Sequence, residues 1–290
     1  MSQVRLFMRA PEALARELAG TLEQEFESDG LAVASFEIDE PSRLWEVAVY
    51  CDAARRPEIE SRIRARLSPT DRLIEHEEIA ETDWVIRSLA GLKPVTAGRF
   101  LVHGSHDRAA PKPWQIGVEI DAGQAFGTGH HGTTAGCLFA IGSELRRRRP
   151  RRVLDLGTGS GVLAIAIAKT LHRPVLASDI DPVAVAVARR NFAINGVDRW
   201  ASAVAAAGFR HRAISAHAPY DLIVANILAR PLQMLAPAFA RHAAPAATII
   251  LSGLLTSQCW QVVASFRNAG FALQRHSELD GWATAILRKR

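Results

Sequence analysis

Apolar and polar residues follow different patterns in the two parts of the chain. In the first part, stretches that alternate between apolar and polar residues predict strands, and stretches with an apolar residue at every fourth position predict helices. The strands are expected at residues 3–10, 31–39, 44–52 and 72–81, and the helices at residues 11–26 and 56–67. The order β-α-β-β-α-β is the ferredoxin-like arrangement, so we expect a small α+β domain over residues 1–81.

From residue 152 onward, apolar strands alternate with helical patterns. The strands are expected at residues 152–157, 174–180, 220–228, 247–255, 271–279 and 281–290. Asp181 and Pro182 suit the cap and first position of a helix, and Asp280-Gly281 predicts a tight turn between the last two strands. The pattern indicates an open, mostly parallel α/β sheet with an antiparallel C-terminal hairpin. We expect this domain at residues 119–290, after a linker helix and loops at residues 82–118.

The composition favours a globular protein of the cytoplasm. Of the 290 residues, 48% are apolar and 22% are charged, which suits one large or two modest domains. The longest nearly unbroken apolar run, residues 162–168, is too short to span a bilayer, so we expect no membrane association. Arg5 and Arg9 interrupt the first apolar stretch, which argues against a signal peptide. The three cysteines form no CxxC pair and are expected to be buried or inert.

The positive charge is unevenly distributed. The net charge is +5 and the pI is about 9.5, values that are compatible with a nucleic-acid partner. The run Arg146–Arg152 reads RRRRPRR, just before the strongest predicted strand. A solvated connector is the default interpretation of this run, and a contact to ribosomal RNA or to another acidic partner is the alternative. Aromatic residues do not interleave with the arginines, which argues against a base-stacking surface.

A glycine-rich loop, DLGTGSG at Asp155–Gly161, separates a predicted strand from a predicted helix. Its G-x-G-x-G spacing differs from the dinucleotide fingerprint, and no Gly-Lys-Ser/Thr follows that would indicate a phosphate loop. A carboxylate at Asp155 is unfavourable beside a pyrophosphate but suits an ammonium or a sulfonium. Asp179 ends the next strand, where one carboxylate can accept both ribose hydroxyls. Together these features favour S-adenosylmethionine, although a tight turn with a helix-capping acid remains an alternative.

Asn226 is a polar residue at the end of an otherwise apolar strand, on the edge where α/β sheets bind ligands. Methyltransferases that act on adenine amines or planar amides often have Asn-Pro-Pro-aromatic at the comparable place. Here the sequence is Asn226-Ile-Leu-Ala, which favours a more flexible amine as the methyl acceptor. A structural role for Asn226, in capping the next helix, remains open.

The second part of the chain resembles the ribosomal protein methyltransferase family PrmA, whose substrate is the eleventh protein of the large subunit (L-eleven, L11). The blocks that carry the resemblance are AFGTGHHGTT, VLDLGTGSGVLAIA, SDIDPVAVAVARRN, DLIVANILARPL, LSGLLTSQ and GWATAILRK. The resemblance implies a Rossmann-like class I methyltransferase sheet joined to a ferredoxin-like substrate-recognition domain. It also implies an enzyme that methylates lysine ε-amines and an N-terminal α-amine to the trimethyl stage. The sequence does not determine the oligomeric state, and a monomer is the simpler expectation.

The resemblance assigns roles to particular positions of this chain. The segment Gly123–Thr134 covers the cofactor, and Asn226 positions the reacting groups without a general base being assigned. The expected cofactor-binding residues are Phe126, Gly127, Thr134, Asp155, Gly157, Gly159, Asp179 and Asn226. Where the family commonly has Thr-His-Pro, this chain has His130-His131-Gly132, which leaves individual roles within that loop open.

Three expectations complete the hypothesis. Adjacent residues such as His130 and His131 seldom direct both rings at one ion, and no other ligand set is suitably spaced, so we expect no metal site. An RNA methyltransferase that holds ribosomal RNA through Arg146–Arg152 is the first alternative function. A non-catalytic S-adenosylmethionine-binding protein is the second.

Overall fold

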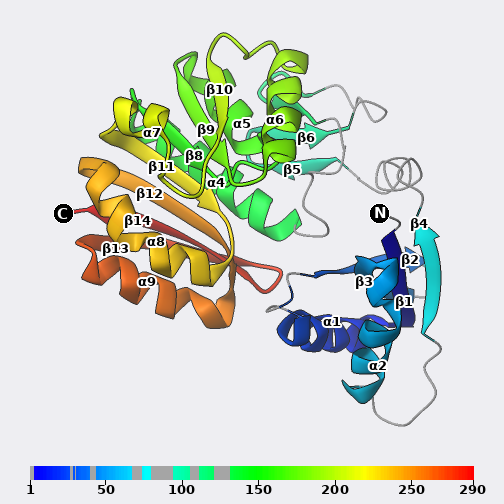
Figure 1. Ribbon diagram of the computed structural model, residues 1–290. Helices are drawn as coiled ribbons and strands as arrows, with labels where there is room; N and C mark the ends of the chain where they lie inside the picture. The colour runs from blue at the N-terminus through cyan, green and yellow to red at the C-terminus, as the bar shows by residue number, and fades with distance from the viewer. Residues whose placement is uncertain are drawn as a thin grey trace. The chain divides into compact units, whose positions relative to one another are not determined.

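The chain forms two compact units, Met1–Ala90 and Gly91–Arg290. The computed structural model describes residues 3–26, 29, 31–39, 44–66, 74–79, 94–104, 111–120 and 131–290 (Figure 1). None of the helices in this described part is long and apolar enough to cross a membrane.

The N-terminal unit is an antiparallel four-stranded sheet with two helices. Its elements are β1 (Gln3–Pro11), α1 (Glu12–Phe26), β2 (Ala32–Asp39), β3 (Leu44–Asp52), η2 (Ala53–Arg55), α2 (Arg56–Arg66) and β4 (Glu75–Ile79). The strand order β2-β3-β1-β4 is ferredoxin-like, which confirms the predicted fold of this part. The apolar positions spaced by four explain the packing, because Leu22, Phe26, Ile59 and Ile63 are all fully buried in one core with the strands.

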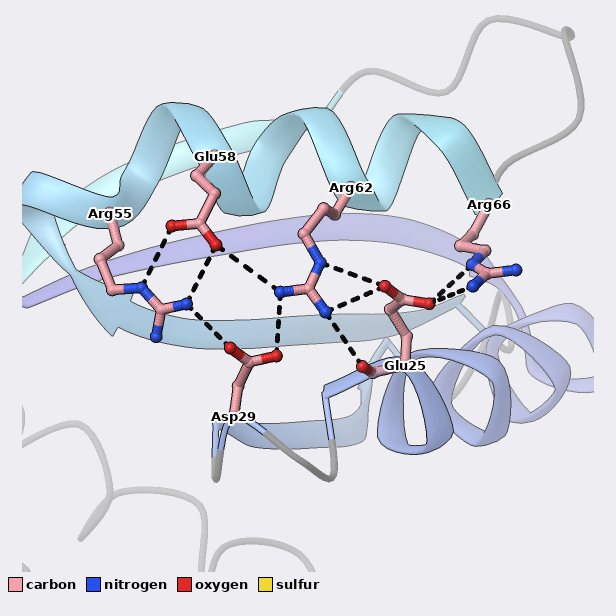
Figure 2. Close-up of polar contacts among 6 residues, drawn as sticks. All are labelled: Glu25, Asp29, Arg55, Glu58, Arg62 and Arg66. Atoms are coloured by element: carbon pink, nitrogen blue, oxygen red, sulfur yellow. Dashed lines mark hydrogen bonds and ion pairs between the residues drawn. The ribbon is translucent and has the colours of Figure 1, made fainter.

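An ion-pair network joins the two helices of the N-terminal unit (Figure 2). Arg62 of α2 contacts Glu25 at 3.0 Å and Asp29 at 2.9 Å. Arg55 pairs with the same Asp29 at 2.9 Å, and Arg66 donates to Glu25 at 2.7 Å. Hydrogen bonds from Arg55 and Arg62 lower the pKa of Asp29, and those from Arg62 and Arg66 lower the pKa of Glu25. Where α1 meets α2, Arg55, Arg62 and Arg66 are therefore each matched by carboxylates.

The second unit contains a seven-stranded sheet in the order β10-β9-β8-β11-β12-β14-β13. The strands from β10 to β12 in this order are parallel, and β14 pairs antiparallel with both β12 and β13. The strands are β8 (Val153–Leu156), β9 (Val175–Asp179), β10 (Ala201–Ala205), β11 (Tyr220–Asn226), β12 (Ala243–Leu255), β13 (Phe271–Leu279) and β14 (Trp282–Lys289). The predicted parallel α/β sheet with an antiparallel hairpin is confirmed.

Helices cover both faces of this sheet (Figure 1). They are α4 (His131–Arg147), α5 (Val162–Leu171), α6 (Pro182–Ile194), α7 (Arg212–His217), α8 (Ala229–His242), η3 (Thr256–Gln258) and α9 (Cys259–Asn268). Residues of α4, α5 and α6 share one core with the sheet, and residues of α7, α8 and α9 share the other. Because each parallel strand leads into a helix, the connections that follow β8, β9 and β11 lie at one edge of the sheet.

The segment before α4 contains strands where loops were predicted within residues 82–118, and the predicted linker helix lies outside the described residues. Within it the structure has β5 (Val95–Ala97), β6 (Phe100–His103) and β7 (Ile116–Glu119), which form a three-stranded sheet. Phe100 and Val118 of this sheet are fully buried in the core that contains α4 and α5. Strands of three or four residues are too short for alternation to reveal them, which explains the difference.

Candidate functional site

The glycine-rich loop follows β8 at the carboxyl edge of the large sheet and is attached to the neighbouring strand. The backbone N–H groups of Gly157 and Thr158 both donate to the Ser178 carbonyl of β9, at 2.7 and 2.9 Å. Gly159 N–H donates to the Asp179 carboxylate at 2.8 Å. The loop is thus held by β9, so the residues expected to bind cofactor in the two segments are brought together.

Two glycines of the loop occupy positions where a side chain would not fit. Gly157 has φ +73°, and a Cβ atom there would lie 2.2 Å from Cγ2 of Ile227, which follows β11. Gly161 has φ +86°, and its Cβ would lie 2.7 Å from the Phe192 ring. Glycine is needed for both the left-handed backbone and the close approach of neighbouring segments. The loop therefore packs closely against the segment after β11 and against the helix that carries Phe192, which fixes its backbone at the sheet edge.

Asp155 is fully buried one residue before the end of β8. One carboxylate oxygen, Oδ2, accepts from the Thr158 hydroxyl at 2.6 Å and from Ala164 N–H at 3.1 Å. The other oxygen, Oδ1, is buried without a hydrogen-bond partner among the described residues. Burial raises the pKa of Asp155 to about 7, and the charge of Asp179 adds to this. A buried, incompletely satisfied carboxylate is stabilised by a neighbouring cation.

Asp179, the last residue of β9, presents a half-buried carboxylate. Its Oδ2 accepts from Gly159 N–H at 2.8 Å and its Oδ1 from Asp181 N–H at 3.1 Å. Each oxygen has further acceptor capacity, because an ionised carboxylate offers about four lone-pair sites. Asp181 in turn caps α6 by accepting from Val183 N–H at 2.8 Å, as its position before Pro182 predicts. The carboxylate is therefore fixed in orientation and suited to accept from a diol.

Asn226 ends β11 and is linked to a residue that the sequence analysis missed. Its Nδ2 donates to the hydroxyl of Thr133 in the first turn of α4 at 3.3 Å. Thr133 is 2% exposed and lies beside Ser252 of β12, whose hydroxyl contacts the Thr133 carbonyl at 3.4 Å. The carbonyl oxygen of the Asn226 side chain is not used in this hydrogen bond. The signal for Thr133 was present in the sequence as the first threonine of the pair before Ala135.

Other predicted residues are placed less completely. Thr134 is half-buried in the first turn of α4, one residue beyond Thr133. Phe126, Gly127 and His130 lie outside the described residues, so their expected roles remain predictions. Among the described residues, no group of three or more His, Cys, Asp or Glu side chains could hold a metal ion.

Gly132, at the start of α4, has a packing role. A Cβ at Gly132 would lie 3.1 Å from the Leu279 carbonyl and 3.1 Å from Cδ1 of Trp282. These residues flank the turn between β13 and β14, so the absence of a side chain allows this hairpin to approach the start of α4. Gly136, one turn further along, approaches Thr284 of β14 in the same way, because its Cβ would lie 2.3 Å from the Thr284 hydroxyl.

The doubly wound sheet with this glycine loop, two acids and a terminal asparagine defines a class I S-adenosylmethionine-dependent methyltransferase. The residues fit that cofactor, because Asp179 suits a ribose and the unpaired oxygen of Asp155 suits a cationic group. S-adenosylmethionine is the methyl donor of this class.

Comparison with known proteins identifies the family. The family model described as ribosomal protein L11 methyltransferase (PrmA) matches residues 23–290. The chain is 50% identical to a ribosomal protein L11 methyltransferase of Rhizobium johnstonii over 289 residues, which are 99% of each chain. It is 47% identical to the one of Agrobacterium fabrum over 100% of both chains. The chain therefore belongs to the ribosomal protein L11 methyltransferase family and is an S-adenosylmethionine-dependent protein methyltransferase.

A solved structure agrees with this assignment. The crystal structure of a ribosomal protein L11 methylase from Lactobacillus delbrueckii subsp. bulgaricus is 26% identical, with a TM-score of 0.61. The match covers 69% of this chain and 99% of that chain. Both the fold and the family predicted from the sequence are confirmed.

Proposed function

We propose that this protein transfers methyl groups from S-adenosylmethionine to lysine ε-amines, to the N-terminal α-amine, or to both, of ribosomal protein L11. We further propose that each amine is carried to the trimethyl stage. The observation that carries the choice of an amine acceptor is the Asn226 side chain. Its Nδ2 is held by Thr133, so its carbonyl oxygen can accept a hydrogen bond from an amine N–H.

The cofactor-binding residues are proposed from the same geometry. Asp179 accepts the ribose hydroxyls, and the Oδ1 atom of Asp155 faces the cationic part of the cofactor. The backbones of Gly157 and Gly159 allow close approach. Thr134, together with Phe126 and Gly127 of the predicted cover, completes the site.

S-adenosylmethionine supplies a methyl group bonded to a positively charged sulfur, which an uncharged amine can displace. A lysine ε-amine titrates near 10.4, so removing its proton at pH 7 costs about 4–5 kcal/mol. The chain can meet part of this cost by holding the amine away from water, and we assign no general base. Asn226 orients the amine lone pair by accepting an N–H, and much of the rate comes from aligning nitrogen, carbon and sulfur.

The N-terminal unit is proposed to recognise L11. Its ferredoxin-like sheet lacks the glycine loop and paired acids of the second unit, so its contribution is binding and not chemistry. We propose that the protein acts as a monomer in the cytoplasm, where unassembled ribosomal proteins are available as substrates.

The decisive experiment compares methyl transfer by the wild-type protein, Asn226→Ala and Asn226→Asp. L11 lacking its native methylation is incubated with cofactor and analysed by mass spectrometry. We expect additions in groups of three methyl groups with the wild type, at least a tenfold lower rate with Asn226→Ala, and a smaller loss with Asn226→Asp, which keeps an acceptor oxygen. Wild-type rates in both variants would contradict the role of the carboxamide. Cofactor binding without transfer to L11 would support the non-catalytic alternative.

A further inference from the structure

The edge of the large sheet opposite the cofactor loop carries a dense set of arginines. We call it the arginine edge, and it comprises Arg146, Arg147, Arg148, Arg149, Arg151, Arg152, Arg173 and Arg199. All of these are exposed except Arg173, which is half-buried. They lie at the C-terminal turn of α4 and just before β8, β9 and β10. Because these strands are parallel, their starts meet at one edge.

Most of this charge is not used to stabilise the fold. Within the described part of the chain, the side chains of Arg146, Arg147, Arg149 and Arg151 have no hydrogen bond or ion pair. Arg148 reaches Glu144 only at 3.8 Å. The N-terminal unit is the opposite case, since its arginines at the α1–α2 junction are each paired with carboxylates (Figure 2). Carboxylates therefore pair with the arginines that join α1 to α2, whereas most arginines of the arginine edge have no carboxylate partner.

Three carboxylates line the hollows of the arginine edge, and of these only Asp198, beside Arg199, is exposed. Glu144 is buried and accepts from Thr248 at 2.7 Å and from Arg288 at 3.1 Å. Asp221 accepts the backbone N–H groups of Arg151 and Arg152 at 2.8 and 3.0 Å. These bonds order the backbone of the run without covering its guanidinium groups, so the run is a fixed surface and not only a solvated connector.

The surface is hollowed at two adjacent places that share Arg151. One pocket, of about 160 Å³, is lined by Arg151, Arg152, Arg199, Trp200 and His217 among others. The second, of about 410 Å³, is lined by residues that include Arg148, Arg149 and Arg151. The Arg199 guanidinium lies 5.3 Å from the Trp200 ring centre. Guanidinium groups around two neighbouring hollows can hold successive anionic groups of one polymer.

We propose that the arginine edge binds the phosphate backbone of RNA. Every basic residue that defines it is an arginine, whose planar guanidinium can donate two hydrogen bonds to one phosphate. Neither of the two pockets is lined by a large exposed apolar side chain. A surface that binds a membrane would need such side chains, so a membrane is not the expected partner. The choice of RNA over DNA rests on the proposed action on a ribosomal protein. Since the edge lies opposite the cofactor loop, bound RNA leaves the methyl-transfer site open to the protein substrate.

Binding of a short fluorescein-labelled single-stranded RNA, measured by anisotropy between about 50 and 200 mM salt, tests this proposal. The variant combines Arg147→Gln, Arg149→Gln and Arg151→Gln. Each lost phosphate contact lowers the slope of log affinity against log salt by about 0.7, so the triple variant should lose about 2 from the slope. Its affinity for S-adenosylmethionine should match the wild type, which shows that the fold is intact.

A matched control removes the same charge from the other edge of the sheet. Arg210, Arg212 and Arg230 are exposed residues that follow the carboxyl ends of β10 and β11, and their triple Gln variant should retain the wild-type slope. Equal slopes for the wild type and the arginine-edge variant, or equal losses in both variants, would overturn the proposal. So would loss of methylation of purified L11 by the arginine-edge variant without RNA, because the edge would then bind protein. Wild-type RNA binding without any L11 methylation would contradict only the proposed function.

Discussion

Replacing Asp155 with asparagine should change how the stability of the protein depends on pH. The substitution keeps the shape of the side chain. It also keeps an oxygen that can accept from the Thr158 hydroxyl and Ala164 N–H, which donate to Oδ2 of Asp155 in the wild type. It removes the carboxyl group that titrates at that position. Because the carboxyl group is fully buried, its ionisation in the folded protein is opposed by the loss of solvation, and the variant is free of this effect.

The size of the effect follows from the raised pKa. In the folded protein the pKa of Asp155 is about 7, whereas an aspartate in an unfolded chain titrates near 3.9. The folded state therefore holds the proton more tightly than the unfolded state. The contribution of the Asp155 carboxyl group to the stability of the folded protein is fully present below about pH 4 and is lost as the pH rises towards 7. At about 1.4 kcal/mol per pKa unit, the loss between pH 5 and pH 8 is on the order of 2–3 kcal/mol.

Urea unfolding of the cofactor-free protein at pH 5 and pH 8 measures this loss. The free energy of unfolding of the wild type should fall by about 2–3 kcal/mol more than that of Asp155→Asn over this interval. Asp198→Asn, which removes an exposed carboxylate, should follow the wild type. If the wild type and Asp155→Asn show the same pH dependence, the burial argument for Asp155 is wrong.

The remaining predictions concern cofactor binding and substrate recognition. If ionised Asp155 faces a cation, wild-type affinity for S-adenosylmethionine should rise about tenfold from pH 6 to pH 8 by calorimetry, and that of Asp155→Asn should not. Asp179→Ala should weaken this binding by about 1.5–3 kcal/mol, the value of hydrogen bonds to a charged group; unchanged affinity would exclude the ribose contact. Gly157→Ala should lower both stability and affinity for S-adenosylmethionine, because its Cβ would displace Ile227. Gly196→Ala, also at positive φ but with open space around it, should lower stability alone. Equal cofactor affinities in the two variants would show that the contact between Gly157 and Ile227 does not shape the cofactor site. Deleting Met1–Ala80 should leave cofactor binding intact and abolish methylation of L11, and an active truncated protein would refute the recognition role.

Local patterns in the sequence predicted the elements that position the site. Asp181 caps α6 as expected, and Asp280 and Gly281 have φ of 50° and 80°, as a tight hairpin turn requires. The all-apolar stretch after the glycine loop became α5, in which most side chains are fully buried. These features depend on residues a few positions apart, which is why a single sequence reveals them.

Features that depend on distant residues were missed. Thr133 and Asn226 are separated by 93 positions, so only the folded sheet brings the start of α4 to the end of β11. The strands β5 and β6, of three and four residues, are defined by their pairing and not by an apolar period. The raised pKa of Asp155 likewise arises from complete burial, which the surrounding helices create.

Following the transferred methyl group is the most direct test of which molecule this enzyme modifies. The purified protein is incubated with tritiated S-adenosylmethionine and a mixture of ribosomal RNA and ribosomal proteins that lack their native methylation. We expect label on amines of a single protein, L11, with none in the RNA even when the RNA binds to the arginine edge. Label in RNA alone would contradict this expectation and identify the arginine edge as part of an RNA-methylating enzyme.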